Sequence, residues 1–182
     1  MAVLKHFRTA GFQFISVPGI VLLAATPALA KSYLTLEQAQ QAIFPGQTLT
    51  PFPFVLSSEQ QAVLEEKSGT RGYFKEQRIW RVEGGGFFIV DEVIGKHEFI
   101  TYALGINRDG SIRQIEIMDY REAYGYQIRQ KRWRRQFLGK TDADALKLNE
   151  DIKNISGATL SCRHVTEGVK RNLVLYELYL KQ

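Results

Sequence analysis

The sequence predicts an α+β fold: a single domain with a mainly antiparallel sheet flanked by helices. Three observations support this fold class. Strand-like patterns are grouped in the middle of the 182-residue chain, helix-like patterns stand on both sides of that group, and short turn signals separate the strands. About 150 residues remain after the N-terminal leader, which is enough for one domain with a packed core. We therefore expect one domain over residues 31–182.

The first 30 residues have the pattern of a secretory signal peptide. Lys5 and Arg8 form a basic start, an apolar stretch covers residues 12–25, and Ala28-Leu29-Ala30 supplies the small residues of a cleavage site. We expect cleavage after Ala30 and a periplasmic or other extracytoplasmic location. An uncleaved N-terminus that anchors the domain to a membrane is the alternative.

Two helices are predicted at the start of the mature chain, and each begins with a capping box. Thr35 with Gln38 precedes the first helix, and Ser57 with Gln60 precedes the second. A Phe-Pro-Gly sequence is predicted to end the first helix, and Gly69 to end the second.

Four strands are predicted next, near residues 73–82, 87–94, 99–106 and 112–118. Residues 107–110, with the sequence Asn-Arg-Asp-Gly, form a hairpin turn between the last two. The run of three glycines between the first two strands is interpreted as a turn, because no Gly-Lys-Ser/Thr follows it to complete a phosphate loop.

A C-terminal amphipathic helix is predicted from apolar residues that recur at spacings of three and four. The predicted buried stripe consists of Val165, Val169, Leu173, Tyr176 and Leu180. The opposite face is expected to be charged, with Glu167 four residues before Arg171 and Glu177 four residues before Lys181. This helix is expected to pack on the sheet.

The motif Ser156-Gly157-Ala158-Thr159-Leu160-Ser161 stands at the start of this helix. Its small residues let the phosphate of a ligand approach the backbone, and the N–H groups and dipole of a helix N-terminus attract that phosphate. Thr159 adds a hydroxyl. Ordinary helix capping requires the same residue types, so the motif alone leaves both interpretations open.

This motif, with Ile155 before it and Val165-Thr166-Glu167-Gly168-Val169 after it, resembles the FMN-binding domain family. That family includes the flavin-carrying subunits of the Rnf complex and of the sodium-translocating NADH:quinone reductase. The resemblance covers roughly residues 85–175. It also includes Gly95-Lys96-His97, the following strand with its Asp109-Gly110 turn, the run Tyr120-Arg121-Glu122-Ala123-Tyr124-Gly125-Tyr126, Trp133, Gln136-Phe137 and Gly139-Lys140.

The resemblance implies FMN joined to Thr159 through a phosphoester bond, installed from FAD by a magnesium-dependent flavin transferase outside the cytoplasm. By the same match, the phosphate end is formed by Ser156, Gly157, Ala158, Leu160 and Ser161, and the ring side by Glu122, Tyr124, Gly125 and Tyr126. Relatives commonly carry Asp six positions before the acceptor Thr, where this chain has Lys153.

The function predicted from this resemblance is that of an exported electron carrier, which passes electrons between a membrane or periplasmic donor and an acceptor. The isoalloxazine ring would supply the redox chemistry. Two alternatives stay open: a flavin-dependent reductase that acts directly on a small molecule, and a flavin-free binding protein of the same fold.

Charge argues against nucleic acid as a partner. The formal net charge is +5, and loss of the leader would leave 22 basic and 19 acidic residues. The densest basic run consists of Arg129, Lys131, Arg132, Arg134 and Arg135. It is interpreted either as a solvated face or as a docking site for an acidic redox partner or membrane headgroups.

The remaining candidate side chains are few. Cys162 is the single cysteine, which excludes an internal disulfide, and its spacing places it on the buried stripe of the C-terminal helix. His97 and His164 are too scattered to suggest a metal site with Cys162, and no metal is predicted. Ser161 and His164 lack the strained turn and the oriented acid that a hydrolase requires. His97 is interpreted as a surface or capping residue, or as a neighbour of the flavin or of a partner.

Overall fold

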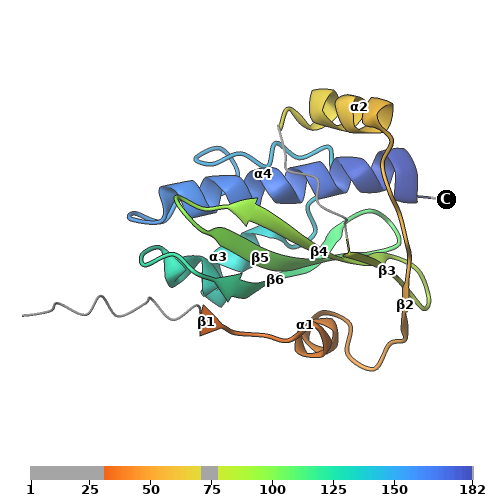
Figure 1. Cartoon of the computed structure of the whole chain (residues 1–182), viewed down its shortest axis with the longest axis horizontal. Helices are drawn as coiled ribbons and strands as arrows, with labels where there is room; N and C mark the ends of the chain where they lie inside the picture. Colours follow the sequence, from red (N-terminus) through yellow and green to blue (C-terminus); the bar gives the residue numbers. More distant parts are fainter. Residues whose placement is uncertain (1–30, 71–77, 182) are drawn as a thin grey trace, which may run out of the picture.

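One antiparallel sheet forms the centre of the computed structural model, which describes residues 31–70 and 78–181 (Figure 1). In these residues the strand order is β1-β6-β5-β4-β3-β2, and every neighbouring pair is antiparallel. The strands are β1 (Lys31–Ser32), β2 (Leu49–Pro51), β3 (Arg78–Val82), β4 (Phe87–Ile94), β5 (Phe99–Ile106) and β6 (Ile112–Tyr120). The α+β prediction is confirmed.

The predicted strands agree closely with the observed ones. β4 and β5 have the predicted bounds, and β6 continues two residues further, to Tyr120. The first predicted strand is confirmed from Arg78, whereas its residues 73–77 lie outside the described part of the chain. The short strands β1 and β2 were not predicted, because two or three residues show no periodicity.

Helices cover both faces of the sheet. α4 (Thr159–Leu175) crosses one face with α2 (Ser58–Ser68) beside it, and α1 (Leu36–Ile43) packs on the other (Figure 1). Side chains alternate accordingly along β4. Ile89 belongs to the larger core that contains α4, and Phe88 belongs to the smaller core that contains α1.

Both capping boxes are confirmed. The Thr35 and Ser57 side chains each accept a hydrogen bond of 3.2 Å from the backbone N–H three residues later, and each glutamine side chain accepts one in return. α1 ends before Phe44, and α2 ends at Gly69, whose φ of 66° is the left-handed conformation that glycine adopts most easily.

The predicted stripe of α4 is confirmed, since all five residues are buried, although the last two lie in a π-helical turn, Tyr176–Leu180. The Glu177–Lys181 pair is also present, at 2.8 Å. The placement of Arg171 on the charged face was wrong. Arg171 is 3 % exposed, and its guanidinium pairs with Asp91 of β4 at 2.5 Å.

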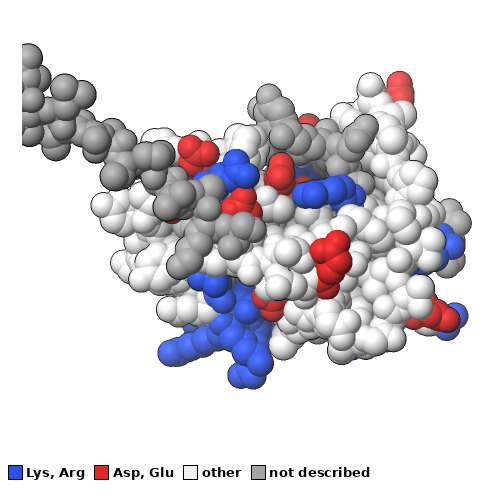
Figure 2. All heavy atoms as spheres, turned by 60° about the horizontal axis from the view of Figure 1, so that its bottom comes forward, with Lys and Arg blue, Asp and Glu red and all other residues white. Residues whose placement is uncertain are grey.

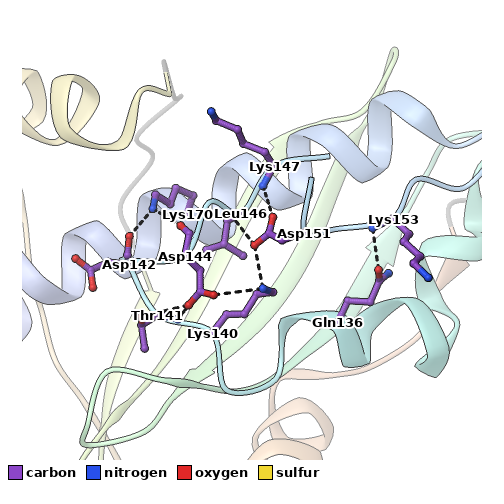
Figure 3. A network of polar contacts seen from close by, with 10 residues as sticks. All are labelled: Gln136, Lys140, Thr141, Asp142, Asp144, Leu146, Lys147, Asp151, Lys153 and Lys170. Atoms are coloured by element: carbon purple, nitrogen blue, oxygen red, sulfur yellow. Dashed lines mark hydrogen bonds and ion pairs between the residues drawn. The ribbon is translucent and has the colours of Figure 1, made fainter. Parts of the chain in front are cut away.

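Between β6 and α4 the chain forms three short helical segments and a long loop. The segments are η1 (Tyr126–Arg129), α3 (Lys131–Arg134) and η2 (Arg135–Phe137). The Lys140 ammonium fixes the loop, at 2.9 Å from a carboxylate oxygen of Asp151 and 3.4 Å from one of Asp144 (Figure 3). Within residues 31–70 and 78–181, no helix combines the length and the hydropathy that a membrane span requires.

Candidate functional site

The small-residue motif lies where the long loop enters α4. Ser156 and Gly157 are exposed, Ala158 is buried, and Thr159 is the first helical residue. Gly157 has a φ of 81°, and a Cβ added there would meet no other atom within 4 Å. The motif is therefore accessible from the surface, at the N-terminus of a 17-residue helix.

The Thr159 side chain is exposed and is held by one neighbour. The Asn154 side-chain amide donates a hydrogen bond of 2.9 Å to the Thr159 hydroxyl oxygen. Because Asn154 acts as the donor, the hydroxyl proton of Thr159 is not used in this contact. Sequence reasoning missed Asn154, since nothing in the pattern distinguishes it from any other polar loop residue.

The N-terminus of α4 carries no side-chain cap. Its N-cap residue is Ala158, no side chain of the motif accepts a hydrogen bond there, and the first turn contains no acidic residue. Capping residues normally satisfy these N–H groups and offset the positive end of the helix dipole. The ordinary-capping interpretation of the motif is therefore not what the structure shows.

The segment that follows β6 contacts the motif directly. A Cβ added to Gly125, whose φ is 90°, would lie 2.5 Å from the Tyr120 hydroxyl oxygen and 3.3 Å from the Cα and Cβ of Ala158. The Tyr120 hydroxyl also donates to the Tyr124 carbonyl and lies 3.0 Å from the Ser161 hydroxyl oxygen of α4. Glycine is thus required where this segment touches the motif.

Glu122 of the same segment holds the turn between β4 and β5. One of its carboxylate oxygens accepts backbone N–H bonds from Lys96, from His97 at 2.5 Å and from Glu98 at 3.0 Å. Gly95 leaves room for this oxygen, because a Cβ there would lie 2.6 Å from it. The Glu122 carboxylate therefore binds the backbone of the turn. Its effect on the site is to position that turn.

His164 links the same turn to α4. Its Nδ1 lies within hydrogen-bonding distance of the Ile94 carbonyl and 3.1 Å from the Gly95 carbonyl. Carbonyl oxygens only accept, so Nδ1 carries the proton. The turn, the segment after β6 and the start of α4 thus contact one another in three pairs.

Residues 95–174 match the model of a protein family described as the FMN-binding domain. This part of the chain belongs to that family. The match begins in the β4–β5 turn and ends in α4, so it contains all three segments that meet at the site. No curated protein matches the chain significantly.

Membership of the FMN-binding domain family supports FMN as the cofactor, and the site has surfaces suited to it. The uncapped helix end offers N–H donors to a phosphate. Several large apolar side chains at this end of the FMN-binding domain are also exposed, and apolar and aromatic surface suits a flat aromatic ring. Their exposed fractions are 84 % for Tyr124, 57 % for Tyr126, 45 % for Ile94, 39 % for Leu160 and 36 % for Phe99.

The acids nearest to the motif do not replace the missing Asp of the family pattern. The Asp151 carboxylate accepts from the Lys140 ammonium and from the backbone N–H groups of Leu146 and Lys147 (Figure 3). Lys153 is anchored through its backbone to Gln136 and Trp133, and its exposed ammonium forms no ion pair within the described residues. The FMN-binding domain therefore presents a cation six residues before Thr159.

The other candidate residues, Cys162, Ser161 and His164, have contacts typical of a structural role. Cys162 is fully buried, and burial raises the pKa of its thiol, as predicted for a core residue. Ser161 and His164 contact different partners, so they form no hydroxyl–imidazole pair. Within the described residues, no group of three or more His, Cys, Asp or Glu side chains is placed to bind a metal.

Replacing Glu122 with glutamine should loosen the β4–β5 turn of the FMN-binding domain. Burial opposes ionisation of this carboxyl, but the three N–H donors outweigh it, and its pKa is lowered from the ordinary 4.5. We expect a loss of about 1 kcal/mol, given the exposure of the group. Amide hydrogen exchange at Lys96, His97 and Glu98 should accelerate at neutral pH.

Acid should reproduce this effect in the wild-type protein. The contribution of a carboxylate with a lowered pKa is complete above the unfolded-state value near 4.5 and is lost as pH falls through the lower folded value. The exposed neighbour Glu98 provides a matched control, since its replacement with glutamine removes no acceptor of these N–H groups. Unchanged exchange in Glu122→Gln would contradict the role assigned to this carboxylate.

Proposed function

We propose that this protein is an exported electron-transfer flavoprotein, with FMN joined through a phosphoester bond to Thr159. The observation that carries the proposal is the exposed hydroxyl at the first residue of an uncapped helix. A helix end without a cap is costly unless another acceptor satisfies its N–H groups. A phosphate attached at Thr159 would be such an acceptor.

The residues around Thr159 have distinct roles in this proposal. Backbone N–H groups of Thr159, Leu160 and Ser161 face the phosphate end, and the helix dipole offsets the charge that a phosphodiester retains. Gly157 leaves the approach open. Asn154 orients the hydroxyl before attachment and can donate to the ester oxygen afterwards. The isoalloxazine ring, when bound, supplies the electron transfer.

Covalent attachment suits a domain that works outside the cytoplasm. A flavin made inside the cell and lost by dissociation outside could not be replaced easily, and an ester bond prevents that loss. In the proposed maturation, the Thr159 oxygen bonds to the FMN phosphorus of FAD, AMP leaves, and the hydroxyl proton is released. A magnesium-dependent flavin transferase would catalyse this step after export directed by residues 1–30.

The test is expression of the full chain in a bacterial host with and without an active flavin transferase. We expect yellow fluorescence on the denatured polypeptide in a gel only when the transferase is present. The mass of the intact protein should rise by one FMN less one water. A colourless band, beside a second substrate that the same transferase does label, would favour the flavin-free alternative, to which Lys153 gives some support.

A further inference from the structure

We propose that Lys131, Arg132 and Arg135, here called the basic face, dock an acidic electron-transfer protein next to the flavin. This inference rests on the proposed function, because it assigns the partner of that site. Basic side chains project together from one corner of the molecule, whereas charges of both signs are scattered over the rest of the same view (Figure 2).

The sequence concentrates uncompensated charge in this segment. No acidic residue occurs in residues 123–141. Two of the cations there are neutralised, since Arg134 pairs with Glu116 and also donates to the Ile115 carbonyl, and Lys140 pairs with Asp151. Arg134 therefore belongs to the structure of the sheet edge and is not available to a partner.

The three residues of the basic face differ from these. Each is exposed, and none forms an ion pair with any residue that the structure describes. Arg129 contributes less, because its guanidinium lies 3.2 Å from the centroid of the Tyr33 ring. Three unpaired cations within five residues of sequence create a local positive potential, although the net charge of the whole chain is mild.

The segment that carries the basic face begins at the candidate flavin site. η1 begins at Tyr126, immediately after Gly125, which contacts Ala158 of the motif. A recess of about 190 Å³ lies between the helical segments and β6. It is lined by Lys131, Arg135 and Leu138, by the paired Arg134 and Glu116, and by Gln114 and Ile115. A partner that placed acidic side chains on the basic face could thus gain an apolar contact at Leu138, which is 47 % exposed.

An acidic protein fits this surface better than a membrane does. Peripheral helices bind membranes by inserting an apolar face below the headgroups. Among the apolar and aromatic residues of η1, α3 and η2, Ile128, Trp133 and Phe137 are at most 3 % exposed and belong to the core. Tyr126 is exposed, but one aromatic ring does not form an apolar face. Complementary charges on two proteins accelerate their association and require no insertion of apolar side chains. Fast association of this kind suits transient electron transfer.

The test is the salt dependence of association with reduced plant-type ferredoxin, used as an acidic one-electron probe. In the triple variant Lys131→Glu, Arg132→Glu, Arg135→Glu, we expect flavin reduction at low salt to slow by about tenfold or more. The difference should shrink between about 0.01 M and about 1 M salt, where the Debye length falls from about 30 Å to about 3 Å. Reduction by a neutral small molecule should be unchanged.

A matched triple variant separates local docking from total charge. Lys67→Glu, Arg108→Glu, Lys147→Glu makes the same charge change at other exposed cations, and Lys147 points away from η2 in Figure 3. Its rate with ferredoxin should stay within about twofold of the wild-type rate. Equal slowing in both triples, or no slowing in either, would overturn the proposal.

Two further measurements complete the test. Binding of the wild-type protein to ferredoxin should be salt-dependent even in preparations that lack flavin, so failure of flavin attachment and failure of docking are distinguishable. Vesicles containing phosphatidylserine provide the membrane comparison. Binding to these vesicles that the basic-face variant abolishes, combined with no effect on ferredoxin, would assign the surface to lipid and overturn the proposal.

Discussion

Replacement of Thr159 with alanine is expected to abolish covalent flavin completely while leaving the fold intact. The two other hydroxyls of the motif are placed differently, because Ser161 is buried against Tyr120 and Ser156 lies three residues before the first helical residue. The Thr159 side chain is exposed and contributes one hydrogen bond, so we expect the free energy of unfolding to change by about 0.5 kcal/mol or less. Gel fluorescence and intact mass measure the first effect, and urea denaturation measures the second.

Two variants control this experiment. Thr159→Ser keeps the hydroxyl and should retain flavin. Ser156→Ala removes an exposed hydroxyl three residues away and should also retain it. Flavin that survives denaturation in Thr159→Ala would place the attachment elsewhere and refute the assignment.

Replacement of Asp91 with alanine should have the largest effect on stability. The same oxygen of this buried carboxylate accepts from Arg171, from the Tyr102 hydroxyl at 2.7 Å and from Asn172 at 2.8 Å. Removing it takes the Asp91 carboxylate away from the buried guanidinium of Arg171. Breaking a buried pair in this way typically costs about 3–5 kcal/mol, which urea denaturation would measure directly.

The double variant Asp91→Leu, Arg171→Met should recover much of this loss, since it removes both charges together. The pair between Asp119 and Arg121 provides the exposed comparison. Arg121 is about half exposed, so Arg121→Ala should cost far less than Asp91→Ala. A loss in Asp91→Ala as small as that in Arg121→Ala would show that the buried network contributes little.

Local signals explain why so much of the fold was predictable. The capping boxes, the Gly69 stop and the bounds of β4 and β5 depend on residues within a few positions of one another, and all of them are confirmed. Arg171 shows the limit of such reasoning. Its spacing from Glu167 is typical of a surface helix, but its partner Asp91 stands 80 residues earlier, and no local pattern records that pairing.

The candidate site likewise has features that the sequence could indicate and features that it could not. The family resemblance assigned the motif and the segment after β6 to one site, and in the structure Gly125 lies against Ala158. It could not show that the Glu122 carboxylate turns toward the β4–β5 turn, or that Asn154 holds Thr159. Both facts depend on side-chain directions, which sequence spacing does not specify.

The three-way contact among the turn, the segment after β6 and α4 has a consequence for maturation. Each segment is tied to the other two by protein atoms alone, through Glu122, Tyr120 and His164. The surface that we propose to receive the flavin is therefore formed by the protein alone, and Thr159 is exposed at its edge. An enzyme can reach the hydroxyl without opening the domain, so folding and loading can proceed as separate events in that order.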